Sequence, residues 1–287
     1  AFLEKLFQAF DLKMPILAIA QIASTTVKEQ NLAAAERMIR NAAAEGASMV
    51  AFPEFLMAFS PADETARELA ARAEPVDGPF VDALREAARA ANIGVLATLY
   101  EICPVPDRVF DTAVWIENSG RIASVYRKLH LYDAFGFKES DKFHPGSDPA
   151  VPHSAEGMLC GMMICYDLRF PEMARMLALD GAAVLFAPSG WVQGDMKLDH
   201  WQTMIKARAL ENGCYVVAPD QTGNIYIGHS LVADPMGRVV SDLGDGEKLQ
   251  CVDLDPGLVA EAREKLPLLK NRREDVYAAH SRRRPTR

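Results

Sequence analysis

The cysteine at position 165 stands where a strand is expected to give way to a helix. An apolar run over 158–164 ends in Cys165, a polar turn follows, and Pro171 lies near the start of a helix expected over 170–179. A side chain at such a junction stands clear of the sheet, and the positive end of a helix favours a thiolate. Cys165 is therefore a candidate nucleophile for a carbonyl carbon, with a buried structural cysteine as the alternative.

Two charged residues lie at the ends of other apolar strands. Glu54 comes directly after the apolar segment 49–52 and Pro53, where desolvation would raise the pKa of a carboxyl toward that of a general base. Lys128 follows Arg127 at the end of a strand expected over 121–126, so strand alternation turns the two cations to opposite faces. One of them could stabilise a thiolate or an oxyanion in a cleft. Taken singly, each is better explained as a solvated surface charge.

Other chemistries have weaker support from the spacing of residues. His130, His144 and His200 could each pair with a cysteine, but none has a papain-like sequence context. No Cys or His pair has zinc-type spacing with a second pair to complete the ligands, so we expect neither a metal nor a cofactor. The remaining four cysteines are interpreted as structural.

Composition limits the class of protein. Of the 287 residues, 49% are hydrophobic and 24% charged, which is typical of a globular protein with a sizeable core. The formal net charge of -8 disfavours nucleic acid as a partner. Five widely spaced cysteines favour a reducing cytoplasm, and no apolar stretch is long enough to suggest a membrane partner.

Strand-like and helical segments alternate along the chain. A tight turn at Asn118-Ser119-Gly120 predicts a hairpin, so antiparallel pairing joins the parallel units. The expected strands are 16–22, 49–52, 93–100, 109–117, 121–126, 158–164, 183–188, 215–219, 230–233, 238–243 and 249–254, with helices near 27–45, 80–88, 170–179, 200–211 and after 256. Without internal repeats or a linker, one domain of two stacked sheets covered by helices is predicted.

Three of these segments occur together in an order that resembles the nitrilase superfamily of carbon-nitrogen hydrolases. They are F-P-E at 52–54, Y-R-K-L-H-L at 126–131 and C-Y-D-L-R-F-P-E at 165–172, and F-H-P-G at 143–146 is a further match. The resemblance extends from Ile16 to about Tyr277. It implies an α/β fold, a four-layer αββα sandwich of two mixed sheets flanked by helices, and a homodimer or larger homo-oligomer.

The resemblance also implies roles for the residues of a Glu-Lys-Cys triad. Cys165 would attack a carboxamide and form a thioester, and Glu54 would act as general base. Lys128 and the backbone N–H of Tyr166 would stabilise the oxyanion. The expected products are a carboxylic acid and ammonia, with water as the second substrate and no cofactor.

The superfamily has a second glutamate between the lysine and the cysteine. Glu139 is the best-placed match, and it would orient Lys128 or the substrate amide. Asp133 and Glu172 are the alternatives.

The residues after the nucleophile bear on the substrate. C-Y-D differs from the C-W-E of nitrile-cleaving members and resembles the Nit-type, omega-amidase-like branch, with N-carbamoyl amino acid hydrolases as the closest competing branch. Arg169 could bind a substrate carboxylate, or pair with Glu172 and brace the turn. Trp191 and Phe59 are candidates for the acyl pocket. Aliphatic, omega-dicarboxylic and aromatic amides all remain open.

The expected division of the chain is an N-terminal extension at 1–13, the hydrolase domain at 14–265 and a C-terminal extension at 266–287. We expect the last segment to contact a partner subunit, with a solvated tail as the alternative. The alternative from another functional class is a non-catalytic binding module on the same fold, in which the triad would be vestigial.

Overall fold

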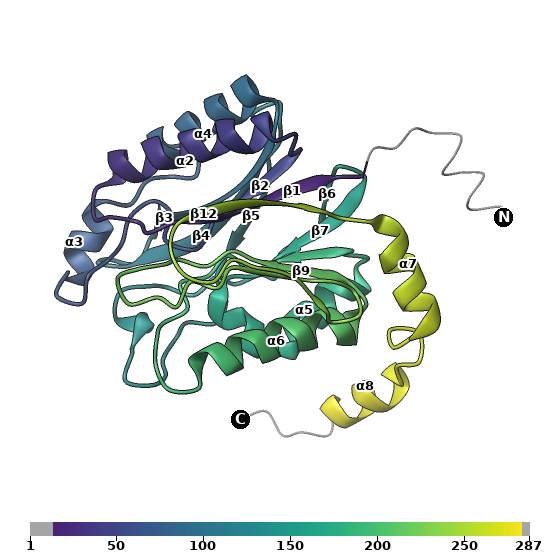
Figure 1. The fold of residues 1–287 in the computed structure, drawn as a ribbon. Helices are drawn as coiled ribbons and strands as arrows, with labels where there is room; N and C mark the ends of the chain where they lie inside the picture. The colour runs from purple at the N-terminus through teal and green to yellow at the C-terminus, as the bar shows by residue number, and fades with distance from the viewer. Residues whose placement is uncertain (1–13, 283–287) are drawn as a thin grey trace.

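Two six-stranded sheets pack face to face in the computed structural model, which describes residues 14–282. Helices cover the outer face of each sheet, so the molecule has four layers (Figure 1). The predicted αββα sandwich is confirmed. The expected N-terminal extension at 1–13 and the last five residues of the C-terminal extension lie outside the described residues.

The first sheet contains the N-terminal strands and one strand from near the C-terminus, in the order β12-β1-β2-β3-β4-β5. The central strands β1, β2 and β3 are parallel, whereas the other neighbours pair antiparallel. The strands are β1 (Ile16–Gln21), β2 (Met49–Ala51), β3 (Gly94–Ile102), β4 (Val109–Ile116), β5 (Ile122–Arg127) and β12 (Lys248–Asp253), and the helices are α2 (Lys28–Ala44), α3 (Ala66–Ala71) and α4 (Pro79–Ala91). The expected hairpin is the β4–β5 pair.

The second sheet has the order β11-β10-β9-β8-β7-β6, with β7, β8 and β9 parallel. Its elements are β6 (His153–Ala155), β7 (Met158–Met162), α5 (Pro171–Leu179), β8 (Val184–Phe186), α6 (Lys197–Asn212), β9 (Tyr215–Ala218), β10 (Leu231–Ala233) and β11 (Val239–Asp242). Helix α6 begins at Lys197, three residues before the expected start, since the added residues contain no helix breaker and place Asp199 in the first turn.

Side chains of the central strands alternate between two cores. In β1, Leu17 and Ile19 join the core between the sheets, whereas Ala18 and Ala20 pack under the helices of the outer layer. Both faces of such a strand are buried, which explains its continuous apolar sequence. Trp115 of β4 contacts Phe186 of β8 across the sandwich, with ring centroids 5.4 Å apart. The two sheets thus share one interior.

The parallel strands of both sheets end at the same edge of the sandwich. Ile22, after β1, forms an isolated parallel bridge with Gln221, which follows β9. The Gln221 side chain also donates to the backbone carbonyl of Glu54, at 2.8 Å. Since segments after β2, β7, β8 and β9 all emerge here, this edge gathers the loops from both sheets.

The chain ends in two helices beside the sandwich (Figure 1). Helix α7 (Pro256–Lys265) buries Val259 and Ala262, whereas α8 (Glu274–Arg282) has exposed side chains from 274 to 280. Among residues 14–282, none of the helices has the length and apolar character needed to cross a bilayer.

Candidate active site

A buried ammonium group joins two of the predicted carboxylates. Lys128 Nζ donates to Glu54 Oε1 at 2.7 Å and to Glu139 Oε1 at 2.8 Å. The exposed fractions of the Lys128, Glu54 and Glu139 side chains are only 2%, 1% and 9%. Glu54 follows β2, Lys128 follows β5, and Glu139 opens the 3-10 turn η1 (Glu139–Asp141). The fold therefore assembles this group from three separate segments.

Cys165 opens the 3-10 turn η2 (Cys165–Arg169) directly after the segment that continues β7. Its φ of 43° lies in the left-handed region, which a cysteine adopts only under constraint from its surroundings. One such constraint is a hydrogen bond of 2.9 Å from the Cys165 N–H to the carbonyl oxygen of Pro188, a residue that follows β8. The predicted strand-to-helix junction is present, because α5 begins at Pro171.

The Asp167 side chain anchors the turn that carries Cys165. This fully buried carboxylate accepts from Ile164 N at 2.9 Å, from Tyr126 Oη at 2.6 Å and from His130 N at 3.1 Å. Arg208 of α6 donates to Leu168 O at 2.9 Å. These contacts tie the turn to β5 and α6 and fix the direction of the Cys165 side chain.

Burial and charge set the protonation states of the site. Burial raises the pKa of the Cys165 thiol well above its usual value, and the Glu54 carboxylate raises it further against the opposing effect of Lys128. For Lys128, burial alone would lower the pKa, but Glu139 and Glu54 hold it well above its usual value. Burial also raises the pKa of Glu139, against the charge of Lys128. The site therefore combines a thiol that favours its protonated form with an ammonium that favours its charged form, so the thiol needs a base.

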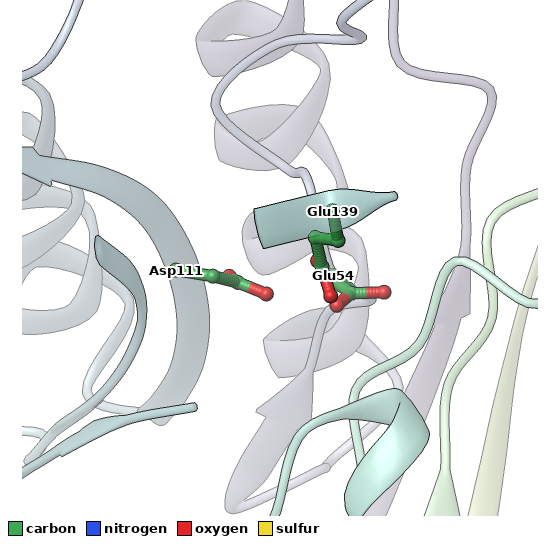
Figure 2. A group of neighbouring side chains, drawn as sticks. All are labelled: Glu54, Asp111 and Glu139. Atoms are coloured by element: carbon green, nitrogen blue, oxygen red, sulfur yellow. The ribbon is translucent and has the colours of Figure 1, made fainter. Parts of the chain in front are cut away.

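A third carboxyl group, which the sequence analysis did not single out, faces the same ammonium. Asp111 of β4 lies with its Oδ2 3.7 Å from Lys128 Nζ. Figure 2 shows its side chain pointing toward those of Glu54 and Glu139, and one oxygen from each of the three lies within 4.8 Å of the others. Such a set of oxygens has the composition of a cation site, and the Lys128 ammonium is the cation that it surrounds.

A small pocket opens above Cys165. Its walls include three of the candidate site residues, Tyr166, Arg169 and Trp191, together with Tyr132 and Lys197. The Arg169 guanidinium lies 4.5 Å from the centroid of the Trp191 ring. Lys197 Nζ hydrogen-bonds to Tyr132 Oη, and burial followed by the charge of Arg169 lowers the pKa of Lys197. The pocket thus presents two cationic groups near the thiol.

Some of the predicted side chains lie elsewhere. Phe59 is not among the residues lining the pocket, because its N–H donates to Thr25 O at 2.9 Å and its ring packs edge-on against Tyr226. Asp133, an alternative to Glu139, instead accepts from Ser140 Oγ at 2.7 Å.

Glu172 was considered both as an alternative to Glu139 beside Lys128 and as a partner of Arg169. Among residues 14–282, Lys128 forms ion pairs with Glu54, Asp111 and Glu139 and not with Glu172. The Arg169 guanidinium stacks on the Trp191 ring, whereas one of the two alternatives for Arg169 was a pairing with Glu172 that braces the turn.

Lys197 and Asp111 were missed for different reasons. Lys197 lies at the first position of a helix that we expected to begin later. Asp111 lies within a strand, where an acidic residue normally faces solvent, and only the pairing of β4 with β5 brings it opposite Lys128.

Comparison with known proteins agrees with this fold. Residues 16–264 match the family model described as carbon-nitrogen hydrolase. The chain is 36% identical over 259 residues to a deaminated glutathione amidase of Escherichia coli O157:H7, covering 90% of this chain and 97% of that protein.

Solved structures give the same result. The NitFhit protein of C. elegans superposes with a TM-score of 0.86 at 31% identity, covering 93% of this chain and 67% of that one. An amidase from Nesterenkonia sp. AN1, in which acrylamide has added to the active-site cysteine, has a TM-score of 0.75 at 25% identity, covering 92% and 99%.

The chain belongs to the carbon-nitrogen hydrolase family, and it is an amidase that acts on carbon-nitrogen bonds other than peptide bonds. Within the nitrilase superfamily it falls in the Nit-type branch. The resemblance inferred from the motifs is confirmed at both levels.

Proposed function

We propose that the protein hydrolyses a small carboxamide through a thioester on Cys165, with Glu54 as general base and Lys128 as oxyanion donor. The observation that carries this proposal is the Lys128 ammonium, which lies 2.7 Å from Glu54 and acts electrostatically on the Cys165 thiol. An acid, an amine and a thiol in one buried site are the groups that acyl transfer to sulfur requires.

In the acylation step, Cys165 Sγ attacks the amide carbon while Glu54 accepts the thiol proton. The carbonyl oxygen becomes an oxyanion, which Lys128 and the backbone N–H of Tyr166 stabilise. Glu54 then transfers the proton to the nitrogen as the carbon-nitrogen bond breaks, so ammonia leaves and a thioester remains.

Deacylation reverses these roles with water in place of ammonia. Glu54 removes a proton from water, the resulting hydroxide adds to the thioester carbon, and the same donors hold the second oxyanion. Collapse releases the carboxylic acid, and the proton on Glu54 returns to the Cys165 sulfur. Glu139, which bonds Lys128 Nζ at 2.8 Å, keeps the ammonium oriented in both steps.

For the substrate, we propose an amide that also carries a carboxylate. Arg169 and Lys197 both line the pocket above Cys165, and the Nε of Arg169 is buried without a hydrogen-bond partner among residues 14–282. A carboxylate would satisfy that donor through a charge-assisted hydrogen bond. Relatives named deaminated glutathione amidase are consistent with an amide of this type. The same two cations would also suit the carboxylate of an N-carbamoyl amino acid, which makes carbamoyl hydrolysis the second candidate.

An ammonia-release panel tests the reaction class. The purified protein would be given short neutral amides, monoamides of dicarboxylic acids, N-carbamoyl amino acids and nitriles. We expect the highest kcat/KM with the dicarboxylic monoamides. Release from nitriles alone would contradict the amidase assignment, and no release from any compound would favour a binding module.

Charge-neutralising variants test the substrate proposal. We expect Arg169→Gln and Lys197→Gln each to raise KM for a carboxylate-bearing amide by about ten- to hundredfold, the equivalent of one charge-assisted hydrogen bond. KM for a neutral amide would change little. Lys206→Gln, an exposed lysine on the same helix as Lys197, is the matched control. Equal effects on charged and neutral amides would reject a carboxylate subsite.

We also propose that the protein is a homo-oligomer and that residues 266–287 contact a partner subunit. The support is helix α8, whose side chains from 274 to 280 are exposed in the single chain, including the apolar Val276 at 47%. A helix that buries none of these side chains within its own chain gains little from tertiary packing, so a partner surface would stabilise it.

A further inference from the structure

Asp111 is a buried carboxyl group that the triad mechanism leaves without a role. It lies on β4 directly across from Lys128, whose N–H donates to Asp111 O at 2.9 Å. Only 1% of the residue is exposed, and neither side-chain oxygen has a hydrogen-bond partner among residues 14–282. A buried polar group of this kind requires an explanation. Its side chain points at the carboxylates of Glu54 and Glu139 (Figure 2).

The arrangement of donors separates Asp111 from the other two acids. Glu54 accepts from Lys128 Nζ and from Gly190 N at 2.6 Å, and Glu139 accepts from Lys128 Nζ and from Tyr132 N. Each of these carboxylates therefore has two N–H donors to stabilise its charge. Within the described part of the chain, Asp111 has no donor at hydrogen-bond distance, and the Lys128 ammonium is 3.7 Å away.

Three ionised carboxylates around one ammonium would leave a net charge of minus two inside the protein. A buried site relieves such a charge by retaining a proton on the acid whose ionised form is least stabilised. Asp111 has fewer hydrogen-bond donors than Glu54 and Glu139, so we expect Asp111 to keep the proton. A proton on Asp111 also gives its side chain a hydrogen-bond partner, because a protonated carboxyl can donate to a neighbouring carboxylate.

We propose that Asp111 is a neutral carboxylic acid in the active enzyme and a positioning residue, whose hydroxyl donates to the neighbouring Glu54 carboxylate. This inference rests on the proposed role of Glu54 as general base. The hydrogen bond restricts the orientation of Glu54, and the absence of a third negative charge allows the thiolate and oxyanion to form. Ionisation of Asp111 at high pH would place that charge beside them and slow the reaction.

The titratable groups that face Asp111 determine the direction of its pKa shift and show which of them would lose a proton near neutrality. Glu54 after β2, Lys128 after β5, Glu139 of η1 and Tyr100 of β3 face it. Burial, and then the charge of Glu54, raise the pKa of Asp111 well above its usual value. The pKa values of Tyr100 and Lys128 are also well above their usual values, so neither loses its proton near neutrality. Asp111 is thus neutral at low pH and becomes charged as pH rises.

The test compares pH profiles of kcat/KM for the wild type, Asp111→Asn and Asp111→Ala. Asparagine has the same size, donates a hydrogen bond and cannot ionise. We expect Asp111→Asn to retain kcat/KM within about threefold at neutral pH and to decline less at alkaline pH than the wild type. Asp111→Ala lacks the donor and should lose about ten- to hundredfold.

Thr112→Val is the matched control, because Thr112 is the next residue of β4 and its hydroxyl donates to Glu101 rather than to the site, at 2.7 Å. Its pH profile should equal that of the wild type. A loss of activity in Asp111→Asn as large as that in Asp111→Ala would overturn the proposal, since it would mean that the negative charge is required.

Infrared spectroscopy gives a measurement that does not depend on turnover. At neutral pH the carbonyl band of a protonated carboxylic acid should be stronger in the wild type than in Asp111→Asn, and the comparison is needed because buried Asp220, whose pKa is also well above its usual value, is present in both. If the wild type shows no such band, or a band no stronger than that of Asp111→Asn, Asp111 is ionised and the proposal fails. Failure of the proposed function would instead appear as a wild type that releases no ammonia from any amide, whatever the infrared result.

Discussion

Lys128 is the residue on which the other charges of the site depend. Its ammonium bonds both Glu54 and Glu139 and is the nearest cation to Asp111. Removing one partner from a buried ion pair leaves the other charge uncompensated, which is more costly than losing the pair as a whole. Under the proposed mechanism, stability and catalysis would therefore depend on the same group.

We predict that Lys128→Met will lower the free energy of unfolding by about 3 to 5 kcal/mol, because buried carboxylates lose their counterion. Ammonia release should fall by about a hundredfold or more, the effect of losing an oxyanion donor. Chemical denaturation and steady-state kinetics would measure the two effects.

Lys265→Met is the control for this experiment. Lys265 lies on helix α7, and its side chain is 66% exposed and pairs with Glu261, which is 52% exposed. An exposed pair of this kind contributes little to stability, so the variant should remain active and close to the wild type in stability. If Lys128→Met behaved in the same way, Lys128 would not be the hub of the site.

The sequence motifs singled out four candidate residues that the structure brings into one group: Glu54, Lys128, Glu139 and Cys165. Glu54, Lys128 and Cys165 were singled out because each stands at the end of a strand in a distinctive sequence context, and Glu139 because the family resemblance places a second glutamate there. Asp111 could not be found in this way, because its significance comes from a strand pairing that brings it beside Lys128.

At the level of elements, the turn η2 determines where the thiol stands. It is braced mainly by Asp167, which accepts four hydrogen bonds, including one from His130 Nδ1 at 2.7 Å. These donors come from β5, from the segment after it and from the end of the β7 segment. The contacts explain how a left-handed cysteine is kept in place, since several elements act on one short turn.

We predict that Asp167→Asn will destabilise the fold by about 2 to 4 kcal/mol, since one acceptor oxygen becomes an amide that faces hydrogen-bond donors. Ammonia release should decline with it, because the turn that carries Cys165 loses its brace. Thermal unfolding and kinetics on the same samples would check this.

Asp180→Asn is the comparison, since Asp180 is an exposed residue after α5 and its substitution should have little effect. An Asp167→Asn variant as stable and active as Asp180→Asn would show that the turn does not need the carboxylate.

The alternation of strands and helices was predictable because it is a local property of hydrophobic spacing. Sheet order was not, since the antiparallel pairing of β12 with β1 joins residues more than two hundred positions apart. The short helix α3 also escaped the analysis, although its capping box between Thr65 and Glu68 is visible in the sequence.

For the molecule as a whole, the stacked sheets bring the ends of two sets of parallel strands to one edge. Glu54 belongs to the first sheet, Cys165 to the second, and Gly190 N joins them by donating to Glu54 Oε2 at 2.6 Å. The site is therefore formed between the two halves of the sandwich. Neither half contains all the groups that the proposed reaction needs.

The C-terminal segment provides a test of assembly at the same scale. We predict that truncation after Lys265 will lower the oligomeric state relative to that of the full chain, because it removes α8 but leaves the buried residues of α7 in place. Light scattering coupled to size-exclusion chromatography would measure the mass of each. A full chain and a truncated chain of the same oligomeric state would contradict the proposed contact.

Catalysis by Cys165 is the central claim, and ammonia release by Cys165→Ala tests it most directly. Cys160→Ala is the matched control, since Cys160 is a buried cysteine on β7 of the same sheet. We predict that Cys165→Ala stays folded while its release of ammonia from an amide falls by at least about a thousandfold, and that Cys160→Ala remains active. Normal turnover by a folded Cys165→Ala would contradict the mechanism.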